Sequence, residues 1–195
     1  MGRRGPWWRC WRWYGRFGWG GFLLSLLSLL PCALAADEPA LPEQQVKAAY
    51  ILNFTRYASW PATTLADPRA PLVVCVIGQD AGDIARRLQS RAAGSHPLEL
   101  RTITRNEEGD GCHTLYIGAS EKARQGALLA RLRDQAILTI GDSTSFLADG
   151  GMINLMLVDG TIRFEVNLAA AKRSGMSLNP RVLALAERVL GGASK

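Results

Sequence analysis

Two histidines and two cysteines are the side chains after position 35 that are best suited to nucleophilic, redox or metal chemistry. Neither His96 nor His113 accompanies a Gly-x-Ser-x-Gly sequence, the usual setting of a nucleophilic serine with a nearby base. The spacings Cys-x-x-Cys and His-x-x-x-His do not occur, and there is no Asp-rich calcium loop. The sequence therefore predicts a protein that is not an enzyme and that needs no metal ion or cofactor.

Two other kinds of chemical site, a phosphate-binding site and an assembled enzyme site, have less support in the sequence. Residues 78–82 (Gly-Gln-Asp-Ala-Gly) follow an apolar run and precede a helical pattern, which is where doubly wound folds bind phosphate. They lack the full Gly-x-Gly-x-x-Gly spacing of a dinucleotide site. An enzyme site assembled from Asp80, Asp142 and His113 would use suitable residue types, but no spacing in the sequence supports it.

The first 35 residues have the pattern of a secretory signal. Five arginines and no acidic residue precede or flank an apolar run at residues 22–30, and Ala33-Leu34-Ala35 supplies the small residues that a signal peptidase requires. The alternative is an uncleaved membrane anchor, with the Trp-rich residues before the apolar run lying at the membrane interface. The apolar run is short for spanning a bilayer. A lipid on Cys32 is disfavoured by Pro31 before it. We expect export to the periplasm and cleavage near Ala35 or Ala36, leaving no membrane insertion.

Removal of this leader changes the net charge. The leader carries five of the 23 basic residues and none of the 17 acidic ones, so the mature chain is close to neutral. The formal net charge of +6 is therefore mostly a property of the leader. The mature chain shows no basic stripe, and we expect no nucleic-acid binding.

Cys75 and Cys112 remain as a pair in an oxidising compartment, and a single disulfide is the natural interpretation. It would stabilise the fold by about 4 kcal/mol in the chain-entropy model. Two buried free thiols are the alternative.

Apolar and polar segments alternate along residues 43–195 in the manner of strands and helices, after a short tether at residues 36–42. We expect helices at residues 43–59, 84–92 and 120–133, and strands at residues 72–77, 98–103, 113–118 and 136–140. This alternation predicts one α/β domain with a mostly parallel sheet covered by helices on both faces.

The first helix should bury one face. The residues at helical spacing expected on that face are Val46, Ala49, Tyr50, Phe54 and Tyr57, and those expected elsewhere are Lys47, Asn53 and Arg56.

The pattern changes toward the C-terminus. Strands at residues 152–158 and 161–167 are separated only by Asp159-Gly160, which predicts an antiparallel hairpin and hence a mixed sheet. The glycines at 150–151 suggest a bulge or a close backbone approach. Helices are expected at residues 168–174 and 180–190.

The second hairpin strand should place Arg163, Glu165 and Asn167 on one face and apolar side chains on the other. The polar face is either a solvated surface with an Arg-Glu pair or a recognition strip.

Taken in order, several segments resemble the YfiR-like family of periplasmic proteins over almost all of the mature chain. The matching segments are residues 46–54 (VKAAYILNF), Trp60-Pro61, residues 75–78 (CVIG), Cys112-His113, residues 150–154 (GGMIN) and residues 163–168 (RFEVNL).

The resemblance implies a compact α/β domain, often a dimer, that represses an inner-membrane diguanylate cyclase by binding its periplasmic sensor region. An outer-membrane OmpA-like lipoprotein would relieve this repression by sequestering the protein. Such a protein would lower cyclic-di-GMP and biofilm formation by favouring the inactive state of the cyclase.

The resemblance also extends to particular residues. Cys75 and Cys112 match the pair that forms a stabilising disulfide in the family. This chain has no cysteine after Cys112, so it lacks a second disulfide found in the best-known member. Ile153 and Glu165, with Arg163 beside them, lie in the matching late strands and are the candidate partner contacts.

A different class of function is also open. A periplasmic module of this fold could bind a small aromatic or nucleotide-like ligand and signal to a membrane sensor kinase.

Overall fold

A computed structural model of the protein describes residues 42–65, 67, 69–89, 91–94, 96–104 and 109–192. The expected leader at residues 1–35 lies outside the described residues, as does the tether up to residue 41.

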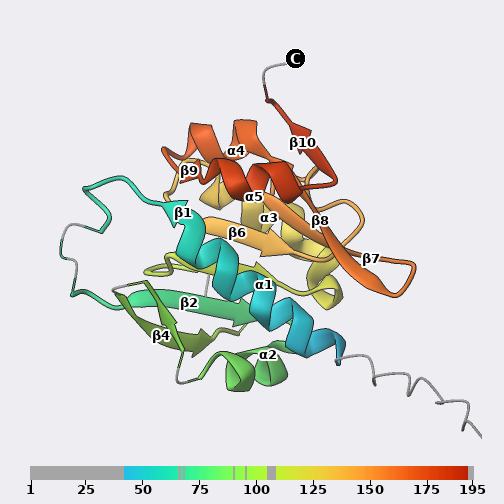
Figure 1. Ribbon diagram of the computed structural model, residues 1–195, viewed down its shortest axis with the longest axis horizontal. Coiled ribbons are helices and arrows are strands. Elements are labelled where there is room, and N and C mark those ends of the chain that lie inside the picture. Colours follow the sequence, from blue (N-terminus) through green and yellow to red (C-terminus); the bar gives the residue numbers. More distant parts are fainter. Residues whose placement is uncertain are drawn as a thin grey trace, which may run out of the picture. The chain divides into compact units, whose positions relative to one another are not determined.

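The described strands form one main sheet with the order β10-β8-β7-β6-β5-β2-β4-β3 (Figure 1). Its central strands are continuous apolar runs because both of their faces are covered. The strands are β2 (Leu72–Ile77), β3 (Ala92–Ala93), β4 (His96–Thr102), β5 (Thr114–Ile117), β6 (Leu138–Gly141), β7 (Ile153–Val158), β8 (Thr161–Asn167) and β10 (Arg188–Leu190). A separate two-stranded pairing joins β1 (Ala58–Ser59) to β9 (Ser177–Leu178).

Most neighbouring strands are parallel. The pairs β4–β2, β2–β5, β5–β6, β6–β7 and β8–β10 are parallel, whereas β7–β8 and β3–β4 are antiparallel. The predicted α/β fold with a mixed, mostly parallel sheet is confirmed.

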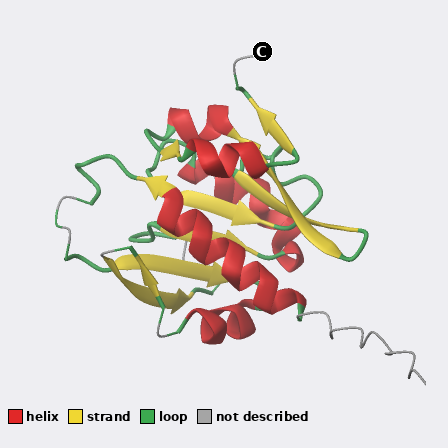
Figure 2. Ribbon diagram, in the orientation of Figure 1, coloured by secondary structure: helices red, strands yellow, loops and turns green. Residues whose placement is uncertain are grey.

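Helices cover both faces of this sheet, as Figure 2 shows. One core, on the face of α1 (Glu43–Tyr57) and α2 (Ala81–Leu88), takes Leu72, Val74 and Val76 from β2. The other core lies on the face of α3 (Lys122–Leu132), which follows a 3-10 turn, η1 (Ala119–Glu121), and takes the intervening β2 residues. Because successive side chains of β2 point to opposite faces of the sheet, this one apolar strand contributes to both cores.

The hairpin between β7 and β8 is formed as predicted. Asp159 and Gly160 connect the strands with φ angles of 48° and 74°, the positive values that a type I′ turn requires at both central residues. Its register pairs Leu155 with Phe164, and both side chains lie in the core on the face of α1.

The predicted helix at residues 180–190 is wrong in its second half. After α4 (Leu168–Arg173), a short helix α5 (Pro180–Leu185) ends at Ala186, whose backbone is extended, and the chain continues as β10. The edge of β8 offers backbone pairing to this segment, and the amide of Glu187 donates to the carbonyl of Phe164 at 2.9 Å. Leu185, the last residue of α5, is 76% exposed.

The glycines at 150–151 mark a close approach, one of the two predicted alternatives. The ring of Phe146 is fully buried and lies between Gly141 and Gly151. A Cβ atom at Gly151 would lie 2.2 Å from the Phe146 ring, and one at Gly141 would lie 2.3 Å from it. Glycine at both positions is therefore required by this ring.

Replacing Gly151 with alanine should destabilise the fold, because the new methyl group overlaps a ring that has no room to move. We expect a loss of about 1–3 kcal/mol in the free energy of unfolding, as for other overpacked cores. Gly82→Ala is the matched control, because Gly82 lies in α2 with nothing within 4 Å of the added Cβ. Urea unfolding of both variants tests this, and equal stabilities would contradict it.

Candidate functional site

A cluster of charged side chains lies at the carboxyl ends of the parallel strands. Asp80 follows β2 and Asp142 follows β6, while Tyr116 lies on β5 between them. The Tyr116 hydroxyl donates to Asp142 Oδ2 at 2.9 Å and is 3.3 Å from Asp80 Oδ2. Lys47 reaches the same point from α1, with its Nζ 2.5 Å from Asp142 Oδ2 and 3.9 Å from Asp80 Oδ2.

The burial of Lys47 corrects the predicted orientation of the first helix. Lys47 is only 7% exposed, while Ala49 and Tyr57, which were expected to be buried, are exposed. A buried ammonium is tolerated where carboxylates compensate it, and Glu43 adds a third at 2.6 Å. Helical periodicity alone could not reveal partners that lie 33 and 95 residues away.

The electrostatics of the cluster keep Lys47 charged and Tyr116 neutral. Burial by itself would lower the pKa of Lys47, but hydrogen bonds to Asp142 and Glu43 outweigh it, so the pKa lies above its ordinary value. Burial and the two aspartates raise the pKa of Tyr116. Tyr116 therefore acts as a neutral donor to carboxylates, and Lys47 as a fixed cation.

A cavity of about 410 Å³ opens beside this cluster, lined by Gln44, Lys47, Gln79, Asp80, Asp83, Ala119, Ser120 and Asp142. It lies at the carboxyl end of β2. Strands β4 and β5, which both come later in the chain, lie on opposite sides of β2, and open α/β sheets bind ligands at such a reversal of strand order. Three of the lining residues are aspartates, so the weak phosphate-site hypothesis at residues 78–82 gains no support.

The alternative enzyme site does not assemble. Asp80 and Asp142 lie together at the carboxyl end of the sheet, but His113 precedes β5 and therefore lies at the opposite end of a parallel strand.

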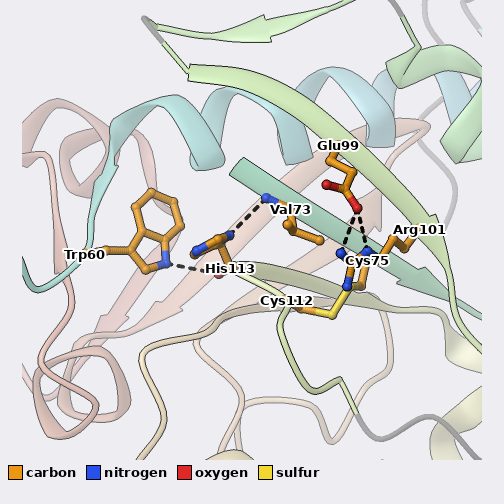
Figure 3. Close-up of a disulfide and its surroundings, with 7 residues drawn as sticks. All are labelled: Trp60, Val73, Cys75, Glu99, Arg101, Cys112 and His113. Carbon is orange, nitrogen blue, oxygen red and sulfur yellow. Dashed lines mark hydrogen bonds and ion pairs between the residues drawn. A yellow bond between two sulfur atoms is a disulfide. The ribbon is translucent and has the colours of Figure 1, made fainter. Parts of the chain in front are cut away.

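Cys75 on β2 and Cys112 before β5 form the predicted disulfide (Figure 3), with their Cα atoms 5.8 Å apart. Cys75 is 0% exposed and Cys112 is 5% exposed, within the core on the face of α3. A bridge so well buried is protected from reductants in the folded protein. Its role is therefore structural, joining two adjacent central strands.

His113 connects the segment that follows β1 to the same strands, as Figure 3 shows. Its Nδ1 accepts from the amide of Val73 at 3.0 Å, and its carbonyl accepts from Trp60 Nε1 at 3.1 Å. Burial, followed by the charges of His96 and Arg101, lowers the pKa of His113, against a hydrogen bond with the Thr64 backbone that raises it. An Nδ1 that accepts a hydrogen bond carries no proton, so neutral His113 is part of the folded structure.

The candidate partner contacts fall in two environments. Ile153 on β7 is 0% exposed, so its side chain lies in the core and presents no surface. Arg163 and Glu165 lie on the opposite face of β8 from Phe164, as predicted, and each pairs with β10 or the residue before it. Arg163 Nη1 lies 2.9 Å from Glu187 Oε1, and Arg188 Nη2 lies 2.8 Å from Glu165 Oε1.

We call Arg163, Glu165, Glu187 and Arg188 the charged strip. Sequence reasoning found its first two members but missed the other two, because they were assigned to a helix.

Comparison with known proteins places the chain in a family. The sequence model of YfiR/HmsC-like proteins matches residues 44–187. The chain belongs to the YfiR/HmsC-like family. The match extends from α1 to the residue before β10, and it includes the disulfide, the cluster around Lys47 and most of the charged strip.

A solved structure shares the fold of this YfiR/HmsC-like protein. The crystal structure of a conserved domain protein from Vibrio cholerae O1 biovar El Tor strain N16961 matches with a TM-score of 0.53 and 13% sequence identity. The match covers 76% of this chain and 60% of that chain. At this identity the likeness concerns the fold alone.

Among the described residues, no helix is long and apolar enough to span a membrane.

Replacing Lys47 with methionine should strongly destabilise this YfiR/HmsC-like protein, because it leaves Asp142 charged and buried without its cation. We expect a loss of about 3–5 kcal/mol in the free energy of unfolding. The double variant Lys47→Met with Asp142→Asn should recover part of the lost free energy of unfolding, because the uncompensated carboxylate is also removed. Lys122→Met, at an exposed lysine, should cost less than about 0.5 kcal/mol. Denaturant unfolding checks the series, and similar losses at both lysines would refute the role of the cluster.

His113 should make stability depend on pH. Its folded-state pKa lies below the ordinary value of 6.5, so the unfolded chain binds a proton more readily. The stability contributed by neutral His113 is therefore present above about pH 6.5 and is lost as the pH falls toward the folded-state pKa. His113→Asn, which retains an acceptor for the Val73 amide, should flatten this part of the curve. Unfolding measured over roughly pH 5–8 would show parallel curves for wild type and His113→Asn if this assignment were mistaken.

Proposed function

We propose that the mature protein binds the periplasmic sensor region of an inner-membrane diguanylate cyclase and represses it, lowering cyclic-di-GMP and biofilm formation. The observation that carries this proposal is the family match over residues 44–187, which spans both cores and the disulfide. Because this chain covers 60% of the Vibrio protein, no partner is inferred from that likeness.

The secretory pattern of the leader supports an exported protein. We propose that residues 1–35 are removed on export and that residues 36–42 tether the domain to the cleavage site. The protein would then meet the cyclase outside the cytoplasm, without contact with the nucleotide.

The charged strip supports a recognition role. Arg163, Glu187 and Arg188 are about half exposed, and exposed ion pairs contribute only about 0–1 kcal/mol to stability. Their charges are therefore available to a partner at little cost to the fold. Ile153 would influence binding only indirectly, by supporting the hairpin from the core.

Repression by a non-catalytic protein requires differential affinity. The protein must bind the inactive state of the cyclase more tightly than the active state, and the ratio of the two affinities limits the repression it achieves. An outer-membrane OmpA-like lipoprotein would relieve repression by lowering the free concentration of this protein. Association into a homodimer is part of the same proposal.

A second candidate, a small-ligand sensor that signals to a membrane kinase, is favoured by one observation. The cavity beside Lys47 lies at the switch point of the sheet and has a volume of about 410 Å³. Ligand-induced stabilisation of the wild type that Asp80→Asn abolishes would support this candidate.

Deleting the gene should raise intracellular cyclic-di-GMP, because the cyclase would lose its repressor. The exported protein should restore the lower level, and the same protein without its leader should not. Cyclic-di-GMP extracted from the four strains gives the comparison. Unchanged cyclic-di-GMP on deletion would refute repression of a cyclase.

A charge swap separates recognition from stability in the charged strip. Arg163→Glu should weaken repression, and Arg163→Glu with Glu187→Arg rebuilds the ion pair with the two charges exchanged. If the pair is recognised by the partner, the swapped variant remains defective although its stability is restored. Full repression by the swapped variant would show that the pair is only structural.

A further inference from the structure

A groove lies between α1 and α2 on the face of the sheet that these two helices cover, and Figure 1 shows the two helices side by side. It encloses about 530 Å³. The groove is lined by Gln45, Val46, Ala48, Ala49, Leu52, Asn53, Arg56, Arg87, Leu88 and Arg91.

The floor and rim of the groove differ in chemistry. Ala48, Leu52 and Leu88 are buried and form an apolar floor. Arg56, Arg87 and Arg91 are exposed on the rim, and Arg87 Nη1 donates to Gln45 at 3.3 Å. The described lining residues include three arginines, and none of them is an aspartate or a glutamate.

The length of the groove argues for a chain rather than a compact ion. The α1 residues that line it run from Gln45 to Arg56, and a helix rises about 1.5 Å per residue, so its wall is roughly 16 Å long. A single phosphate or carboxylate would occupy one end of such a groove. Its concave, partly apolar lining suits a peptide segment better than the surface of a bilayer.

We infer that this groove binds an acidic segment of a partner protein whose apolar residues contact the floor between the arginines. The groove lies on the opposite side of the sheet from the charged strip. Phe164 of β8 packs in the core beneath α1, and its neighbours Arg163 and Glu165 lie on the other face of the strand. The protein therefore carries two separate contact surfaces. This inference goes beyond repression of a cyclase and does not require it.

Binding is tested with the protein purified from the periplasm and two short labelled peptides. One has glutamate and leucine at helical spacing, and the other has lysine in place of each glutamate. The acidic peptide should bind, more weakly as salt rises, and the basic one should not. Amide shifts in NMR spectra should change along α1 and α2.

Charge-reversal variants locate the site. Arg56→Glu with Arg87→Glu and Arg91→Glu should weaken binding of the acidic peptide by roughly tenfold or more, whereas the same three positions changed to lysine should stay within about threefold of wild type. The matched control is Arg133→Glu with Arg173→Glu and Arg181→Glu, at exposed positions outside the groove and the strip. It makes the same change in net charge and should bind like wild type.

Three results would overturn the inference. These are equal losses in the groove and control variants, shifts confined to other elements, and preferential binding of phosphatidylglycerol vesicles or inorganic phosphate at the same arginines. Unfolding curves first establish that each variant is folded. Because no cyclase takes part, failure here is distinct from failure of the proposed function, which the cyclic-di-GMP comparison decides.

Discussion

The position of α1 depends on one buried ammonium group. Lys47 Nζ lies among carboxylates of α1 itself and of the segments that follow β2 and β6, so it ties the helix to the carboxyl ends of two strands. The attraction offsets the cost of removing these charges from water only because their geometry is close and hydrogen bonded. The same helix packs Phe54 against Phe164 of β8, at a centroid distance of 4.9 Å, and forms one wall of the arginine groove. The hairpin core and the groove therefore both depend on where Lys47 places α1.

The central strands are held at both ends by different chemistry. At the carboxyl ends of β2, β5 and β6, Tyr116 connects the two aspartates that Lys47 neutralises. At the amino end of β5, Cys112 is bridged to β2, and His113 joins the backbone of Val73 to Trp60 in the segment that follows β1. Each contact joins neighbouring strands or ties α1 or the segment that follows β1 to them. Such a scaffold suits a protein that presents surfaces to partners, since binding then costs little ordering of the backbone.

The two surfaces proposed for partner contact arise from opposite faces of that scaffold. The charged strip exists because β10 adds to the edge of β8 and brings Glu187 and Arg188 beside Arg163 and Glu165. The groove exists because α2 packs against α1, so that Arg56 of α1, Arg87 of α2 and Arg91 after α2 share its rim.

Local patterns were sufficient for the parts of the protein whose causes lie close together in the chain. The apolar run of β2, the Asp159-Gly160 turn and the alternation along β8 each report a local preference, and all three were predicted correctly. Two features were not accessible in this way. Lys47 occupies a position that helical spacing assigns away from the buried face, and its burial depends on Asp80 and Asp142, which only folding brings near. Residues 188–190 continue a helical apolar pattern, but the unpaired edge of β8 makes them a strand. Sequence thus determined the fold class, the disulfide pair and half of the charged strip, whereas tertiary structure decided the buried ion cluster, the completed strip and the groove, because each joins side chains from distant segments.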